Sequence, residues 1–162
     1  MARHDITLYW AGPLFTQAER LWNRRCAELL RDKGYRVILP QDEAAAFVTA
    51  EGKIEFRAIA EQCYRHSISC DVMIVVLDGA DSDSGASLEA GLKIGHRRAA
   101  RSAEKVIGVR TDFRKSEDEH LNAMFRLLDD SIYLTSVDED LHHLCDEIDS
   151  RVTRLTAEPH AL

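Results

Sequence analysis

Residues 72–91 have the sequence Val72-Met-Ile-Val-Val-Leu-Asp-Gly-Ala-Asp-Ser-Asp-Ser-Gly-Ala-Ser-Leu-Glu-Ala-Gly91. The first six are apolar and rich in β-branched side chains, which is typical of a central parallel strand covered on both faces. An acidic, glycine-bearing loop follows, and Ser82, Asp83 and Ser84 all favour the N-cap position of a helix. The order of strand, loop and helix predicts an α/β sheet, whose ligands bind at the carboxyl ends of the strands.

The remainder of the chain alternates between strand and helix patterns in the same way. Apolar residues recur every three or four positions in several segments, as in amphipathic helices with an inward apolar face. In the first of these segments Leu21 belongs to the apolar face, and Gly34 ends the helix. Strands are expected at 6–11, 35–39, 72–77, 105–109 and 132–134, and helices at 15–33, 54–69, 84–95, 121–128 and 138–155. The polar segment 110–120 is predicted to be a long loop. We therefore predict a doubly wound α/β fold, with a five-stranded parallel sheet flanked by helices.

Composition excludes several classes of protein. A length of 162 residues suits one domain, and no apolar run approaches the roughly 20 residues that span a bilayer. The N-terminus also lacks the apolar segment of a secretory signal, so we expect a cytoplasmic protein without a membrane partner. A net charge of −7 argues against nucleic acid as a partner, because phosphate contacts require clustered Lys and Arg.

The cysteines and histidines do not indicate a metal site. Cys26, Cys63, Cys70 and Cys145 include no Cys-x-x-Cys pair, which favours free thiols. The histidines lack metal-ligand spacing, and neither a Gly-x-Gly-x-x-Gly fingerprint nor a P-loop is present. No cofactor is expected.

Glu89 is the leading candidate for a catalytic group. It lies one to two turns into the helix, near the positive end, where an ionised carboxylate is favoured. Asp83 is either a plain N-cap or a second carboxylate that holds a polar substrate. Tyr9 is either a core aromatic residue or, if it points to the same edge, a group that orients a carboxylate. Gly12 follows the first strand and would let a ligand approach the backbone closely.

Five segments in order along the chain resemble the nucleoside 2-deoxyribosyltransferase family. They are Leu8-Tyr-Trp-Ala-Gly-Pro-Leu-Phe15, Val37-Ile-Leu-Pro-Gln-Asp42, the loop and helix start from Asp78 to Gly91, Gly108-Val-Arg-Thr-Asp-Phe-Arg114 and Asn122-Ala-Met124. The resemblance implies a single domain over 1–162 with a flavodoxin-like (Rossmann-like) sheet. It also implies an enzyme that moves 2-deoxyribose between nucleobases without a cofactor, acting on nucleosides and free nucleobases.

The resemblance also implies roles for three residues near the acidic loop. Glu89 matches the nucleophile that forms a covalent deoxyribosyl-enzyme, and Tyr9 matches the tyrosine that orients it. Asp83 matches an aspartate that helps to hold the deoxynucleoside. A single carboxylate close to the anomeric carbon suits this chemistry, because it can collapse onto an oxocarbenium-like carbon, as in retaining glycosidases.

Further residues are implied by the resemblance alone. Phe15 falls where the family packs an aromatic residue near the base, and Gln41 or Asp42 where it reads base edges. Asn122 and Met124 match residues lent to the active site of a neighbouring subunit, so a homo-oligomer is implied, a dimer at least.

One departure from the family concerns the base. Several members carry an Asp or Asn that contacts the base eight residues before Asp71, where this chain has Cys63. Cysteine is a poor substitute in hydrogen bonding or proton transfer, so the base preference and the base-protonating group stay open. Asp71 itself is expected to serve structure at the beginning of its strand.

Three alternatives to the transferase stay open. If water reaches the intermediate, the same site is an N-glycosidase of 2-deoxynucleosides or their 5′-monophosphates, with phosphate bound by Arg110, Arg114 or Arg126. Asn122 suits a free 5′-hydroxyl, which favours the transferase. A receiver-type module would use Asp78, but Ala11-Gly12 and Thr135-Ser136 replace the acidic pair and lysine that it requires. A non-catalytic nucleoside-binding protein would not need a nucleophile.

Overall fold

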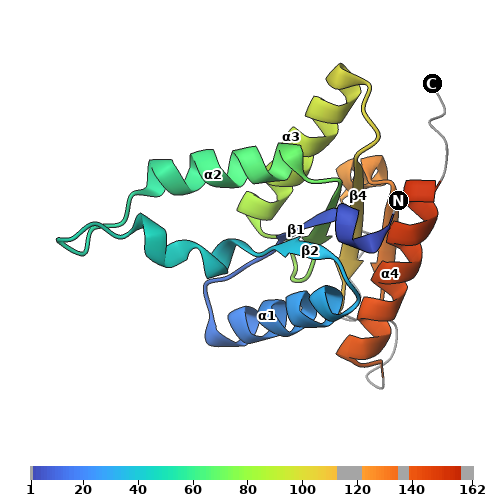
Figure 1. The fold of residues 1–162 in the computed structure, drawn as a ribbon, viewed down its shortest axis with the longest axis horizontal. Coiled ribbons are helices and arrows are strands. Elements are labelled where there is room, and N and C mark those ends of the chain that lie inside the picture. The colour runs from blue at the N-terminus through green and yellow to red at the C-terminus, as the bar shows by residue number, and fades with distance from the viewer. Residues whose placement is uncertain (1, 113–121, 135–138, 158–162) are drawn as a thin grey trace.

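The structure is a computed structural model that describes residues 2–112, 122–134 and 139–157. Within these residues, five short runs of apolar and β-branched side chains form one parallel sheet in the order β2-β1-β3-β4-β5 (Figure 1). The strands are β1 (Thr7–Ala11), β2 (Arg36–Ile38), β3 (Val72–Val76), β4 (Lys105–Arg110) and β5 (Asp130–Tyr133). The predicted doubly wound, flavodoxin-like fold is confirmed.

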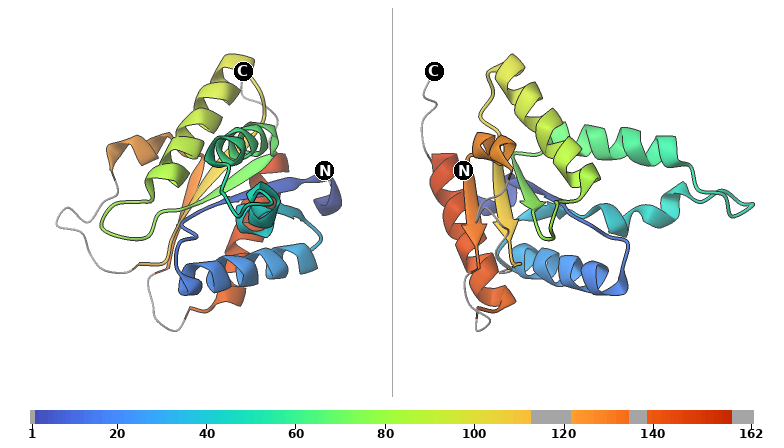
Figure 2. Two further views of the ribbon diagram at one scale, coloured as in Figure 1. Left: turned by 90° about the vertical axis from the view of Figure 1, so that its left-hand side faces the viewer. Right: turned by 180° about the vertical axis from the view of Figure 1, so that it is seen from behind.

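Helices cover both faces of the sheet. Figure 1 and Figure 2 show α2 and α3 on one face and α1 and α4 on the other. The α-helices are α1 (Gln17–Asp32), α2 (Phe56–Ser69), α3 (Ser84–Ala100) and α4 (Leu141–Ala157). Short 3-10 helices are η1 (Arg3–Asp5), η2 (Pro40–Asp42), η3 (Ala44–Phe47) and η4 (Ala123–Leu127).

The alternation of side chains along β1 builds a separate core on each face. Leu8 and Trp10 are buried with the apolar residues of α1 and α4, whereas Tyr9 and Ala11 are buried with those of α3. The strand order reverses between β1 and β3, and in such sheets the ligand crevice lies at this switch point, beyond the carboxyl ends of the strands. Tyr9 therefore points to the α3 face, close to the expected crevice.

Asp71 has the structural role expected of it. The backbone N–H of Thr7 donates a hydrogen bond to Asp71 Oδ2 at 2.7 Å, and the backbone N–H of Asp71 donates to the carbonyl of Thr7. The carboxylate thus supplies an acceptor where the parallel ladder between β1 and β3 begins, and fixes the two strands in register.

Several element boundaries differ from the sequence expectation. The helix expected from residue 54 begins at Phe56, because Ile54 instead pairs with Val48 in an antiparallel bridge. The helix expected to end near residue 95 continues to Ala100, and Arg101 ends it in the left-handed conformation, with φ of 51°. Leu21, expected to face inward, is exposed.

Other expectations fall wholly or partly outside the described residues. Most of the loop predicted for residues 110–120 lies outside them, as do residue 121 and residue 138, where two helices were expected to begin. The described part of the segment 121–128 is the 3-10 helix η4 rather than an α-helix. Among the residues described, no helix has the length and apolar character needed to span a membrane.

Candidate active site

The beginning of α3 is organised by Asp83. Its side chain accepts a hydrogen bond from the backbone N–H of Ala86 at 2.8 Å, so it is the N-cap, and the helix starts at Ser84. The N-cap alternative for Asp83 is therefore observed. Glu89 lies in the second turn, half-buried, on the side of the helix that faces Tyr9 of β1.

Tyr9 and Glu89, 80 residues apart, are in direct contact. The phenol O–H of Tyr9 donates to Glu89 Oε1 over 2.9 Å, and Tyr9 is fully buried. The contact exists because Tyr9 points out of β1 toward the face that α3 covers. The structure thus unites two of the residues expected from the sequence, at the carboxyl edge of the sheet.

Burial dominates the electrostatics of this pair. It raises the pKa of Glu89, against the hydrogen bond from Tyr9, while the negative charge of Asp83 raises that pKa further. The expectation that the helix N-terminus keeps Glu89 readily ionised is thus opposed by desolvation. Burial and the charge of Glu89 also raise the pKa of Tyr9 far above its usual value, so its hydroxyl stays a donor.

Cys63, where the chain departs from the family pattern, lies in α2 and is half-buried. Burial raises the pKa of its thiol. All four cysteines are free, as expected, and the described residues contain no group of three or more His, Cys, Asp or Glu able to hold a metal ion.

The acidic loop itself is braced by hydrogen bonds to the end of β4. Asp78 accepts from the backbone N–H groups of Thr111 and Asp112, at 2.6 and 2.9 Å. Arg110 donates to the carbonyls of Leu77 and Gly79, at 2.6 and 3.1 Å. Asp78 therefore joins two loops, a role that needs no phosphoryl group, and the Arg110 guanidinium is engaged by backbone carbonyls.

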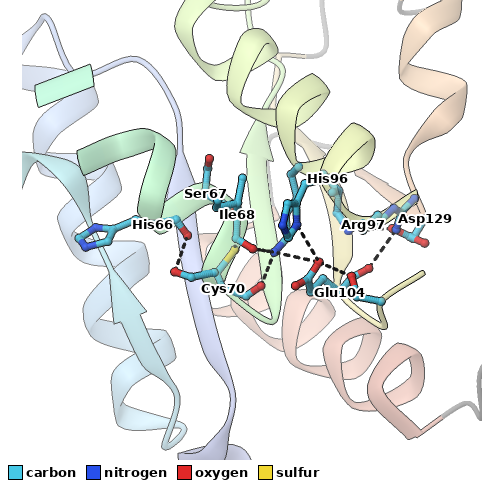
Figure 3. A network of polar contacts seen from close by, with 12 residues as sticks. His66, Ser67, Ile68, Cys70, His96, Arg97, Glu104 and Asp129 are labelled. Carbon is cyan, nitrogen blue, oxygen red and sulfur yellow. Dashed lines mark hydrogen bonds and ion pairs between the residues drawn. The ribbon is translucent and has the colours of Figure 1, made fainter. Parts of the chain in front are cut away.

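A buried lysine on α3 forms hydrogen bonds with the backbone at the end of α2. Figure 3 shows the surrounding network, which includes Ile68, Cys70 and Glu104. The ammonium of Lys93, whose side chain is fully buried, donates to the carbonyls of Ile68, at 3.1 Å, and Cys70, and lies 3.6 Å from Glu104 Oε2. Lys93 follows Glu89 by one helical turn, so this contact fixes the part of α3 that carries Glu89.

The likeness to known proteins agrees with this geometry. A family model described as nucleoside 2-deoxyribosyltransferase matches residues 8–124, which is most of the chain. The chain belongs to the nucleoside 2-deoxyribosyltransferase family. The matched range includes Tyr9, Cys63, Asp83 and Glu89.

Individual relatives share the fold at low identity. An uncharacterized protein of Ureaplasma parvum is 29% identical over 153 residues, covering 88% of this chain and 96% of the relative. A conserved protein of Enterococcus faecalis superposes with a TM-score of 0.69 at 23% identity, covering 90% of this chain and 98% of the other. A 2-deoxyribosyltransferase from Bacillus psychrosaccharolyticus superposes with a TM-score of 0.64 at 20% identity, covering 86% of this chain and 90% of the other. A Clostridium botulinum CMP N-glycosidase superposes with a TM-score of 0.55 at 15% identity, covering 88% of this chain and 98% of the other.

Some residues that the family resemblance implicates have structural contacts of their own. Gln41 is buried, and its amide donates to the carbonyl of Arg20 at 2.8 Å. Asp42 accepts from Arg31 at 3.0 Å. A Cβ atom on Gly12 would lie 2.9 Å from Val76 Cγ2, so close packing by itself favours glycine there. These residues stay predictions as ligand contacts.

The remaining family positions lie on the surface. Phe15 is 79% exposed and Met124 is 68% exposed, which leaves both side chains free of the core. Asn122 caps η4, accepting from the backbone N–H of Met124 at 3.0 Å. None of these three has a described contact with Glu89, and their proposed contacts with a substrate or a neighbouring subunit stay predictions.

Proposed function

We propose that this protein transfers 2-deoxyribose from one nucleobase to another through a covalent deoxyribosyl-Glu89 intermediate. The observation that carries the proposal is the hydrogen bond from Tyr9 to Glu89 at the carboxyl edge of the sheet, within a chain of this family. A half-buried carboxylate held by a fully buried phenol is suited to attack on an anomeric carbon.

The proposed reaction has two displacements. A Glu89 oxygen bonds to C1′ as the C1′–N bond breaks, and the base leaves with a proton whose donor the sequence left open. The nitrogen of a second base then bonds to C1′ as the ester bond breaks, its N–H proton returns to the group that protonated the first base, and Glu89 is released as the carboxylate. Two inversions preserve the β configuration, as in retaining glycosidases. Because burial raises the pKa of Glu89, acid removes the nucleophilic form and activity falls at low pH.

Substrate binding is assigned to the residues around this pair. Asp83 is proposed to help hold the deoxynucleoside, beside its role as N-cap. Phe15 is proposed to pack near the base, and Gln41 or Asp42 to read its edge, with Gly12 at the rim. The substrates are nucleosides and free nucleobases, as the family description indicates.

A homo-oligomer is part of the proposal, with Asn122 and Met124 lent to a neighbouring site. It is supported by exposed apolar side chains on α3, where Leu88 and Leu92 lie one turn apart, and by the exposed Met124. Light scattering after size exclusion should give a dimer or larger, and a monomer at working concentrations would contradict this.

Hydrolysis is the second candidate. If water replaces the acceptor base, the Tyr9–Glu89 pair makes the protein an N-glycosidase, and a CMP N-glycosidase has the same fold. Since Arg110 is engaged by carbonyls, a 5′-phosphate would rely on Arg126, which is exposed, or on Arg114, which lies outside the described residues.

One experiment separates the two reactions. The protein is mixed with thymidine and adenine, and separately with deoxyinosine and adenine, and the products are resolved by chromatography. Deoxyadenosine supports transfer and reveals the accepted donor, whereas free base without a new nucleoside supports hydrolysis. Glu89→Ala should abolish either reaction while the fold is retained, and normal turnover by that variant would refute the proposal.

A further inference from the structure

A buried amide side chain connects the first strand to the loop that carries Phe15. Asn23 lies on α1 and is 2% exposed. Its Oδ1 accepts from the indole N–H of Trp10 at 2.9 Å, and its Nδ2 donates to the carbonyl of Pro13 at 2.8 Å. The same Nδ2 donates to Gln41 Oε1 at 3.4 Å. Asn23 therefore joins β1, the loop that follows it and η2.

The partners of Asn23 require a side-chain amide at this position. An indole N–H only donates a hydrogen bond and a backbone carbonyl only accepts one, so a side chain that bridges Trp10 and Pro13 must present both an acceptor and a donor. An apolar residue would leave both of these groups without this partner. The network continues through Gln41, whose Nε2 donates to the carbonyl of Arg20 at 2.8 Å, so both polar atoms of the Gln41 amide are engaged within the protein.

The loop is also held on the other side of Phe15. Glu19 Oε2 accepts from the backbone N–H groups of Phe15 and Thr16, at 3.0 and 2.7 Å, and Thr16 caps α1. The side chain of Phe15 is 79% exposed, yet the backbone before and after it is bound to side chains of α1. An exposed aromatic ring on a fixed backbone can bind a flat ligand with little further ordering of the loop.

We propose that Asn23 is a positioning residue for substrate binding, which holds the backbone at Pro13 and thereby presents the ring of Phe15 to the nucleobase. The contact between Phe15 and the base rests on the function proposed above, but the hydrogen bonds of Asn23 do not. The loop directly follows β1, which carries Tyr9, so it leaves the sheet at the edge where Tyr9 meets Glu89. Loss of the Asn23 amide should therefore weaken nucleoside binding and leave the nucleophile intact.

Base-exchange kinetics at saturating acceptor base test this role. Without its anchor the loop must be ordered when the nucleoside binds, so Asn23→Ala should raise KM for the donor nucleoside about 2-fold to 12-fold and leave kcat unchanged. A partly unfolded variant would instead lower kcat at constant KM. Phe15→Ala should also raise KM, and the double variant should show no further increase, because Asn23 acts through Phe15. Gln17→Ala is the matched control, since it removes an exposed amide from the first turn of the same helix, and it should leave KM and kcat unchanged.

Amide hydrogen exchange in the free protein provides a readout that needs no activity. The backbone amides of Leu14, Phe15 and Thr16 should exchange faster in Asn23→Ala than in wild type, because the loop opens more often when its anchor is lost. The same amides should exchange at the wild-type rate in Gln17→Ala. Thermal melts show whether each variant is folded.

If Asn23→Ala does not fold, Asn23→Asp takes its place, because it keeps the shape and the acceptor for Trp10 and, when ionised, lacks the donor to Pro13. Unchanged loop amides, an unchanged KM in the Asn23 variant, or a double variant in which the two effects multiply overturns the proposal. If the loop amides exchange faster but no base exchange occurs, the proposed function fails while Asn23 is confirmed as the anchor of the loop. Base exchange with unchanged loop amides has the opposite meaning.

Discussion

Replacement of Tyr9 by phenylalanine removes one oxygen atom and with it the 2.9 Å hydrogen bond to Glu89. Hydrogen bonds to charged groups contribute about 1.5–3 kcal/mol. If the transition state for attack by Glu89 depends on this bond, kcat/KM should fall about 10-fold to 150-fold. Loss of the donor also raises the pKa of Glu89, so the acid limb of the pH profile should move upward and the loss should be largest at low pH.

The assay for Tyr9→Phe is kcat/KM for base exchange, measured from about pH 5 to about pH 9. Tyr64→Phe is the matched control, because Tyr64 is an exposed tyrosine of α2. It should retain wild-type kinetics, and thermal melts should show that both variants are folded. Tyr9→Phe activity within twofold of wild type across this range would refute the assigned role of the hydroxyl.

Three further predictions concern stability and are measured by denaturant unfolding. Burial raises the pKa of Glu89 in the folded state, so above that pKa the ionised carboxylate destabilises the fold. Glu89→Gln should therefore raise the free energy of unfolding at neutral pH. It should give no gain below the unfolded-state pKa, where the carboxyl group is protonated in both states. Lys93→Met leaves the carbonyls of Ile68 and Cys70 without this donor and should cost about 2–4 kcal/mol, whereas an unchanged value would contradict its bracing role. Gly12→Ala should lower the free energy of unfolding by about 1–3 kcal/mol, because the added Cβ would contact the side chain of Val76 on a central strand. A free energy equal to that of wild type would show that Val76 can move aside.

The fold was predictable where local pattern and tertiary environment agree. The run from residue 72 is apolar at every position because β3 is buried on both faces, and Asp83 caps α3 as its residue type favours. The pattern failed at Leu21, which continues the apolar repeat of α1 but is exposed. The end of α3 was also missed, because Gly95 carries no strain in a helix and the chain ends the helix at Arg101 instead.

The candidate site was predictable in its residue types but not in its contacts. Glu89 and Tyr9 were expected from their places near strand ends and from the family resemblance, whereas their contact depends on the packing of α3 on the sheet. Lys93 has the residue type of a solvated helix position, yet it is fully buried. Gln41 is likewise held by internal hydrogen bonds that no local pattern indicates.

The central claim is that Glu89 becomes covalently attached to deoxyribose. The most direct test is rapid quenching of the protein with a deoxynucleoside that it accepts, in the absence of an acceptor base, followed by intact-mass and peptide mass spectrometry. The account predicts a gain equal to one deoxyribosyl group on the peptide that contains Glu89, and no gain in Glu89→Ala. A deoxyribosyl group on another peptide, or wild-type labelling and turnover by Glu89→Ala, would contradict it.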